Sequence, residues 1–197
     1  MSFLQVLIRF QPTDSAEEPY FYGAGSLTDV SVEAASVAES AEGIRVASSQ
    51  GAVIVLDRVF VKATSPTRAS GLTVNSPAVV DGLRVDSSDW GIELGAGGGG
   101  PAPFPVTLTM TNSDVRGGRG GLIGAPGQSS AFVRSSSITG TQFAVWLNSP
   151  GSVDFRAAHT QLSGLVGYSG PNFAACLGGY DANFFPLNAS CQRELLP

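Results

Sequence analysis

The sequence predicts an all-β protein, built as a parallel β-helix of about six coils with a separate closing segment at its C-terminal end. Three observations carry this prediction. Two strand patterns alternate along the chain, and one turn-like segment occurs twice. The chain is also rich in Gly (25 of 197 residues) and poor in charge (14%), with 43% apolar residues, a composition typical of neither disordered nor helical proteins.

The first pattern is a short strand with an apolar residue at its first position and usually another one five positions later. Its copies occupy residues 27–32, 56–61, 80–85, 110–115, 133–138 and, less regularly, 155–160. Alternation with a period of two residues indicates a strand with one buried face.

The second pattern is a four-residue segment that begins with a small residue followed by an apolar one. Its copies are GIRV from Gly43, GLTV from Gly71, GIEL from Gly91, GLIG from Gly121, AVWL from Ala144 and GLVG from Gly164. Two short strands in every 20–30 residues suit one coil of a parallel β-helix, where each strand pairs with its counterpart one coil later. A Greek-key sandwich is the alternative, but it does not predict an ordered alternation of two strand types.

The tripeptide Asn-Ser-Pro follows the second pattern at residues 75–77 and again at 148–150, 73 positions later. This separation equals three coils of about 24 residues. We therefore expect both copies at the same corner of the helix, with Asn in a left-handed turn and Pro ending the strand. The repeat indicates a corner rather than a duplicated active site.

The predicted organisation is an N-terminal cap or first coil at residues 1–24, β-helix coils at 25–170 and a capping segment at 171–197. The segments EAASVAESAEG and GAGGGGPAPFP are expected as excursions at corners, which leave the stacked strands intact. The start, MSFLQVLIRF, lacks the basic region of a signal peptide, and a cut within a longer precursor is one explanation for it.

The two cysteines, Cys176 and Cys191, both lie in the predicted capping segment. A disulfide between them would fix this end of the chain, and the alternative is two unrelated buried thiols. A disulfide predicts an oxidising location: secreted, periplasmic or at the cell surface.

Composition and motifs exclude several functions. The formal net charge of −5 and the single lysine, Lys62, argue against nucleic acid or an anionic membrane as a partner. No apolar run approaches the roughly 20 residues of a transmembrane helix. With one histidine, His159, and no metal-binding or nucleotide-binding motif, the sequence shows no complete active site.

The recurring GIRV and GLTV segments, followed by CLGGYDANFFPLNASC, resemble the C-terminal portion of bacterial pectin-lyase-like, right-handed parallel β-helix repeat proteins. The resemblance covers roughly residues 25–191. It implies a right-handed helix, but it does not imply one activity. The family includes pectate and alginate lyases, polygalacturonases, epimerases, tailspikes and adhesins.

The strand register predicts which side chains face outward. If the first residue of the first pattern faces the core, the next faces solvent. One outer column then contains Thr28, Asp57, Asp81, Thr111, Arg134 and Arg156, and a second contains Ser31, Phe60, Arg84, Asp114, Ser137 and His159. Adjacent coils lie about 4.8 Å apart, so Asp57 and Asp81 are expected side by side, with Arg84 near them.

These charges suggest a ligand site. Asp57 and Asp81 could hold Ca²⁺, although this ion usually takes six to eight oxygen ligands; no other metal or cofactor is expected. Arg84, Arg134 and Arg156 could bind the carboxylate of a uronate. Polysaccharide lyases of the resembled family use Ca²⁺-binding Asp residues and an Arg base, but no catalytic residue can be matched by position. The alternative is that the charges only keep the outer faces soluble.

A third outer column, Arg45, Thr73, Glu93, Ile123, Trp146 and Val166, follows the second pattern. Its apolar part, which includes Trp146, is either a surface for a sugar or a partner, or core covered by another segment.

The main functional hypothesis is a secreted or cell-surface β-helix module with a structural or polysaccharide-binding role. One alternative is a small polysaccharide lyase or epimerase acting on an anionic uronan, although six coils are few for such enzymes. The other is a self-assembling or partner-binding fragment of a larger surface protein, which associates through an exposed N-terminal coil.

Overall fold

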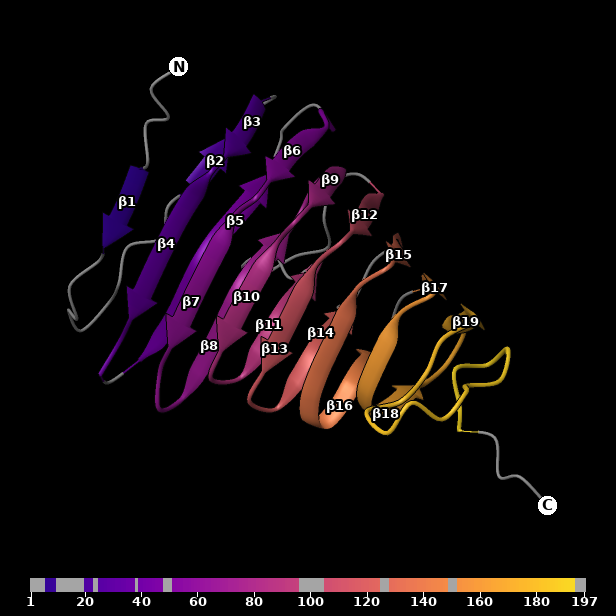
Figure 1. Ribbon diagram of the computed structural model, residues 1–197. Coiled ribbons are helices and arrows are strands. Elements are labelled where there is room, and N and C mark those ends of the chain that lie inside the picture. The colour runs from indigo at the N-terminus through magenta and orange to yellow at the C-terminus, as the bar shows by residue number, and fades with distance from the viewer. Residues whose placement is uncertain are drawn as a thin grey trace.

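The computed structural model describes residues 25–37, 39–47, 51–95, 105–124, 128–148 and 152–193, and the backbone of two earlier strands, Val6–Arg9 and Tyr20–Tyr22. These residues form strands, bends and turns, with no helix among them. The strands are parallel and belong to two sheets, stacked in chain order from one end of the molecule to the other (Figure 1). The predicted all-β class is confirmed. No helix that could cross a membrane occurs in the described part of the chain.

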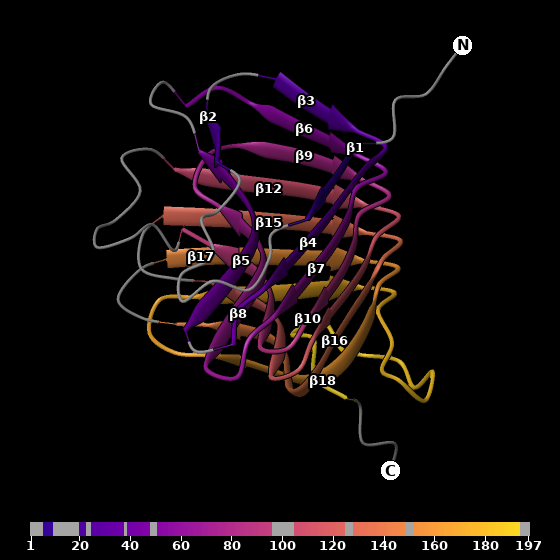
Figure 2. The same cartoon turned by 90° about the vertical axis from the view of Figure 1, so that its left-hand side faces the viewer.

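The smaller sheet, here called the narrow sheet, has seven strands. In spatial order from the N-terminal end they are β3 (Gly25–Thr28), β6 (Ile54–Asp57), β9 (Ala78–Asp81), β12 (Val106–Thr111), β15 (Gln128–Arg134), β17 (Ser152–Ala158) and β19 (Phe173–Leu177). Figure 2 shows most of them lying one above another in chain order.

The larger sheet, here called the wide sheet, consists of two rows of strands that meet at β16. The first row contains β1 (Val6–Arg9), β4 (Val30–Ala35), β7 (Phe60–Thr64), β10 (Arg84–Ser87), β13 (Asp114–Gly117) and the start of β16 (Ser137–Leu147). The second row contains β2 (Tyr20–Tyr22), β5 (Ser40–Ala47), β8 (Arg68–Val74), β11 (Trp90–Leu94), β14 (Gly120–Gly124) and the end of β16. Strand β18 (Gln161–Tyr168) pairs with β16 along both rows.

The chain therefore repeats one three-part path. It passes from a strand of the narrow sheet to the first row and then to the second row, as in β3–β4–β5, β6–β7–β8, β9–β10–β11 and β12–β13–β14. In the next two repeats, β16 and β18 each run through both rows without a break. Each strand pairs in parallel with the equivalent strand of the next repeat, which is the pairing that the alternating sequence patterns predict.

The core is a set of stacked columns of apolar side chains. Leu27, Leu56, Val80, Met110 and Val133 are aligned in register across the narrow sheet, as expected. The residues five positions later, from Val32 to Ile138, are likewise aligned along the first row. All of these side chains are buried except Leu27, which is partly buried in the first repeat. One repeat cannot bury such residues alone, so stacking supplies the core.

Each copy of the first sequence pattern, expected as one strand, in fact contains a bend that joins two strands. The bend is a single residue with a positive φ, at Asp29, Arg58, Gly82, Asn112, Ser135 and His159. Its amide N–H bonds the carbonyl one repeat later, as in Arg58 N to Asp81 O at 2.9 Å. Strict alternation missed the bend because the bend shifts the inward and outward pattern by one residue: the buried Leu56 and Val59 are three positions apart, with Asp57 and Arg58 between them.

The two Asn-Ser-Pro segments follow β8 and β16, which lie three repeats apart in the second row, as predicted. Asn75 N donates to Val46 O and Asn148 N to Gly124 O, so both begin the same corner. The expected left-handed asparagine is wrong, because neither residue is among those with a positive φ. The segment 33–43, expected as a corner excursion, lies largely in β4 and β5. Residues 96–104, the expected Gly-rich excursion, and the N-terminal residues 1–5 and 10–19 lie outside the described residues.

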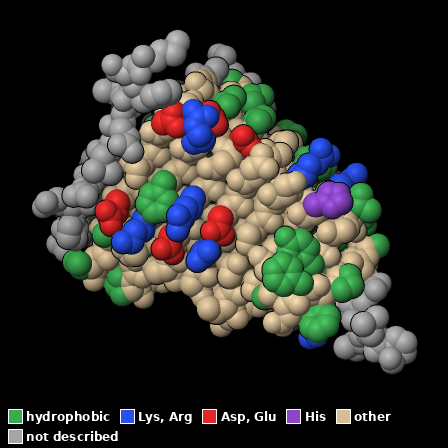
Figure 3. Space-filling view, viewed as in Figure 1, with side chains coloured by type: hydrophobic (Ala, Val, Ile, Leu, Met, Phe, Trp, Pro, Cys, Tyr) green, Lys and Arg blue, Asp and Glu red, His purple; other side chains and the backbone are tan. Residues whose placement is uncertain are grey.

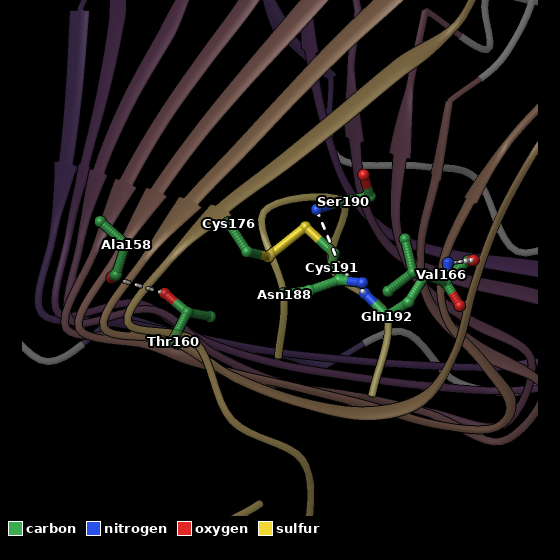
Figure 4. The surroundings of a disulfide bond; sticks show 8 residues. All are labelled: Ala158, Thr160, Val166, Cys176, Asn188, Ser190, Cys191 and Gln192. Atoms are coloured by element: carbon green, nitrogen blue, oxygen red, sulfur yellow. Dashed lines mark hydrogen bonds between the residues drawn. A yellow bond between two sulfur atoms is a disulfide. The ribbon is translucent and has the colours of Figure 1, made fainter. Parts of the chain in front are cut away.

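A disulfide joins Cys176 of β19 to Cys191, which confirms the predicted pair (Figure 4). The segment after β19 lies along the last strands of both sheets. Cys176 N donates to Ala189 O at 2.9 Å. The Gln192 side-chain amide donates to Val166 O at 2.9 Å (Figure 4). Backbone groups at the terminal sheet edge, which would otherwise be open to another chain, are thereby occupied.

Candidate functional site

The outer face of the narrow sheet carries most of the predicted site residues. Thr28, Asp57, Asp81, Thr111 and Arg134 form one outward column in the predicted register. The sixth member is wrong, because Arg134 pairs with Ala158 and not with Arg156. The bulky Phe155 suggested the start of the sixth copy, whereas the small Ala157 occupies that inward position and Phe155 pairs with Ala131. A shift of two residues keeps Arg156 on the outer face but places it two positions earlier along the strand, opposite Phe132.

The N-terminal half of this face is acidic and internally paired. Asp57 and Asp81 are register neighbours, as expected. However, the Arg58 guanidinium donates to Asp57 at 2.6 Å and to both carboxylate oxygens of Asp29, at 2.6 and 2.8 Å. The hydrogen bonds from Arg58 lower the pKa of Asp29.

Asp81 is held by neutral donors. Its carboxylate accepts from Thr111 Oγ1 at 2.6 Å and from Asn112 Nδ2 at 2.8 Å, and these bonds lower its pKa. The described residues contain no cluster of three or more His, Cys, Asp or Glu placed to hold a metal ion. Asp57 and Asp81 thus already have hydrogen-bond partners within the protein. The described residues supply no further ligand for the expected Ca²⁺ site.

The C-terminal half of the face combines arginines with exposed aromatic rings. Arg156 is the register neighbour of Phe132, and its guanidinium carbon lies 5.8 Å from the ring centroid. Asp154 accepts from Arg156 Nη2 at 2.8 Å and Nε at 3.0 Å, and this pair raises the pKa of Arg156. Arg134, two residues after Phe132, is exposed and forms no ion pair with any residue that the structure describes.

Two shallow pockets meet on this half of the face at Arg156. One, of about 460 Å³, is lined by Thr109, Met110, Thr111, Phe132, Val133, Arg134, Arg156, Ala157, Ala158, Ala175, Cys176 and Leu177. The other, of about 530 Å³, is lined by Pro105, Gln128, Ser129, Ser130, Ser152, Val153, Asp154, Arg156, Pro171 and Phe173. We call the two together the narrow-sheet groove. Its apolar side chains are open to solvent, with exposed fractions of 38% for Phe132, 52% for Phe173 and 71% for Leu177.

Arg84 lies on a different face. The bend at Gly82 separates it from Asp81, and it stands on the first row with its guanidinium carbon 5.8 Å from the Phe60 ring centroid. Asp114 is its register neighbour. The adjacent column alternates in sign along Glu33, Lys62, Asp86 and Arg116. Opposite charges on neighbouring strands stabilise one another, so this row fits the solubility interpretation better than a ligand site.

Figure 3 shows the charged side chains of this side of the molecule in separate groups, with positive and negative charges mixed over the first row. The bend residue His159 is exposed, and its backbone N–H donates to Leu177 O at 2.9 Å. Ser137 pairs with Gln161, so the predicted place of His159 in the second outer column is wrong by two residues.

Trp146 lies on the second row and is half-buried. Its ring centroid is 4.8 Å from that of Phe143, whose ring stacks on Trp90 at 6.4 Å. Its register neighbour is Gly167, and the predicted Val166 instead faces the core, because β18 shifts register at this point. The Trp146 ring lies against Gly167, where a side chain would collide with it.

The polar part of the Trp146 column is also shielded from solvent. Glu93 is 3% exposed and accepts from Arg68 Nη2 at 2.6 Å and from Ser70 Oγ. Thr73, its register neighbour, is buried as well. The second row is thus buried on both faces over β8 and β11, and the covered alternative describes it better than an exposed sugar surface.

Several residues of the groove were not predicted. These residues are Phe132, Asp154, Phe173 and Leu177, which all face outward on the narrow sheet. Arg58, at the bend after β6, was not predicted as the partner of Asp57 either. The alternation that placed Arg134 outward also places Phe132 outward, so the segment AFVR contained that signal. Phe173 and Leu177 lie beyond the last copy of either pattern, and only the pairing of β19 with β17 brings them to the face.

The chain was compared with protein-family models, with curated proteins and with solved structures, and none of them matches it.

Proposed function

We propose that this chain is a right-handed parallel β-helix of the pectin-lyase-like type, with about six coils, which binds an anionic polysaccharide in the narrow-sheet groove. Residues 25–170 form the coils and residues 171–197 the cap in this proposal. The repeated three-part path, the parallel pairing and the disulfide support it. The disulfide also supports an oxidising location, where such bonds persist.

The observation that carries the binding role is the environment of Arg134. This arginine lines the groove without an ion pair to any described residue, together with the exposed Phe132, two residues earlier on β15, and the exposed Leu177 of β19. A guanidinium can bind a carboxylate or sulfate through two parallel hydrogen bonds. An aromatic face beside it supplies an apolar surface for the C–H face of a sugar ring.

The groove also has a shape suited to an extended ligand. It crosses four parallel strands, β12, β15, β17 and β19. At about 4.8 Å between strands, this is a path of about 14 Å across the sheet. Stacked repeats therefore offer the same kind of contact at regular intervals, which a polymer of repeating sugars can use.

Binding is favoured over lyase or epimerase chemistry by the groups that line the groove. Its described ionisable side chains are Arg134, Arg156 and Asp154, and the last two are bonded to each other. Proton abstraction needs a base whose pKa suits that task. Arg156, paired with a carboxylate that raises its pKa, is a poor base, and the described groove gives Arg134 no ionisable partner apart from this pair.

A glycan array tests the proposal directly. We expect binding to polyuronates or sulfated polysaccharides, and strong loss of it in Arg134→Gln and Phe132→Ala. Arg84→Gln is the matched control, since Arg84 is an exposed arginine beside an aromatic ring on the other face. Binding that survives both groove variants would contradict the proposal. Release of unsaturated products absorbing in the ultraviolet would instead support the lyase alternative.

A further inference from the structure

The loop between Tyr180 and Pro186 in the C-terminal segment is held in one conformation by its own hydrogen bonds. Tyr180 and Pro186 form an antiparallel bridge, and Asp181 N donates to Phe185 O at 2.9 Å. The Asp181 carboxylate accepts from Asn183 N at 2.8 Å and from Phe185 N at 3.0 Å. Such a turn holds its side chains in place without help from a partner.

The loop is also fixed to the end of the sheets. Leu162 N donates to Tyr180 O at 2.9 Å, and Tyr180 N donates to Thr160 O at 3.2 Å. The Cys176–Cys191 disulfide closes the segment that contains this loop. The loop therefore has a defined position relative to β18 and β19.

Phe184, at the tip of this loop, is exposed and strained at once. Its side chain is 76% exposed, its φ is 61°, and its ring stacks on that of Tyr180 at 5.4 Å between centroids. A bulky residue is rarely found in the left-handed region, which glycine occupies freely. Such outliers concentrate at functional positions, and the described contacts of Phe184 do not bury its ring.

A pocket of about 300 Å³ lies beside the loop. Its apolar lining includes Leu162, Leu165, Val166 and Leu187, and Leu165 is 67% exposed. Asp181 and Arg193 also line it, 3.7 Å apart. We define the C-terminal end face as Phe184, this pocket and the Asp181–Arg193 pair.

We propose that the C-terminal end face is a dimerisation surface, on which Phe184 of each copy enters the pocket of the other. A two-fold axis brings the same patch of both copies together, so one surface must carry both the projecting group and its complement. The end face does so, with an exposed aromatic ring beside an apolar pocket. It also carries one acidic and one basic side chain, Asp181 and Arg193, which can pair across the axis as well as within one chain.

The test is the mass of the 197-residue chain in solution, measured by sedimentation equilibrium over a concentration series. We expect a monomer–dimer equilibrium that approaches twice the 20.2 kDa chain mass. Phe184→Gly should shift it to monomer by at least tenfold in dissociation constant, and Leu165→Glu should do the same from the pocket side. Phe184→Gly should fold normally, since glycine accepts a φ of 61°.

Phe132→Ala is the control, because Phe132 is an exposed phenylalanine on the narrow sheet and should leave the dimer unchanged. A monomer at every concentration would overturn the inference. So would a dimer that persists in both end-face variants, or one abolished by Phe132→Ala, or open polymers in place of a closed dimer. Binding of polysaccharide should not differ between wild type and Phe184→Gly.

Discussion

Gly71 and Val85 lie so close together that a methyl group on Gly71 would overlap Val85 Cγ1 and come within 2.8 Å of the carbonyl oxygen of Gly91. Gly71 belongs to the second row and Val85 to the first. The same relationship joins Gly43 to Val61, Gly91 to Val115 and Gly121 to Ile138. The glycine that begins each of the first four copies of the second sequence pattern is thus required where the two rows of the wide sheet approach each other.

Gly71→Ala should destabilise the protein by about 1–3 kcal/mol, the usual cost of an extra carbon in a packed core. Chemical denaturation measures this free energy of unfolding. Val85→Ala removes the nearest colliding atom, so Gly71→Ala should cost less in that background. Strictly additive effects of the two changes would show that this contact does not set the requirement for glycine.

Ser135→Gly should stabilise the protein by about 0.5–1 kcal/mol. Ser135 holds a φ of 49° at the bend between β15 and β16. This left-handed conformation costs an L-residue roughly 1–2 kcal/mol. Glycine avoids that cost, but part of the gain is offset because glycine has more conformational freedom to lose when the chain folds. Thermal melting of Ser137→Gly, two residues later within β16, is the comparison. That change should lower the melting temperature, and an equal effect at both positions would argue against a left-handed bend.

Loss of the disulfide should lower the free energy of unfolding by about 3 kcal/mol, because the bond closes a loop between cysteines that are 15 positions apart. The pair Cys176→Ser and Cys191→Ser, or reduction of the wild type, can be compared by urea unfolding. The effect should be concentrated in the segment after β19, where amide hydrogen exchange should accelerate most. Unchanged protection of residues 178–193 in the reduced protein would contradict the role given to this bond.

The Asp29–Arg58 pair should make stability depend on acid pH. The pKa of Asp29 is lowered in the folded protein, so its contribution is complete above the unfolded pKa of about 4 and disappears as the pH falls through the folded value. Asp29→Asn should therefore show a shallower loss of stability below pH 4 than wild type does. Parallel pH profiles for the two proteins would mean that the pair is not formed in solution.

How much of this the sequence predicts depends on the kind of information involved. Apolar alternation is set by residues within one strand, so it aligned Leu56, Val80, Met110 and Val133 correctly. It failed in the sixth repeat because Ala157 is small and the neighbouring Phe155 resembles the expected core residue more closely. It also failed at β18, where a register shift turns Val166 inward.

The candidate site was less predictable than the fold. Arg134 was placed on the correct face, but its freedom from an ion pair depends on where the other charges lie in space. The predicted outward columns give Asp57 no basic partner. In the structure Arg58 donates a hydrogen bond to it from a bend that the sequence periodicity does not show. The groove itself arises where β15, β17 and β19 meet, and β19 follows neither sequence pattern.

Titration of the isotope-labelled protein with a short oligouronate, followed by amide chemical shifts, shows whether an anionic polysaccharide binds in the narrow-sheet groove. We expect the largest shifts at Phe132, Arg134 and Arg156, with little change at Phe60 and Arg84. Shifts centred on the Arg84 face, or the absence of any shift with both uronate and sulfated oligosaccharides, would rule out binding in this groove.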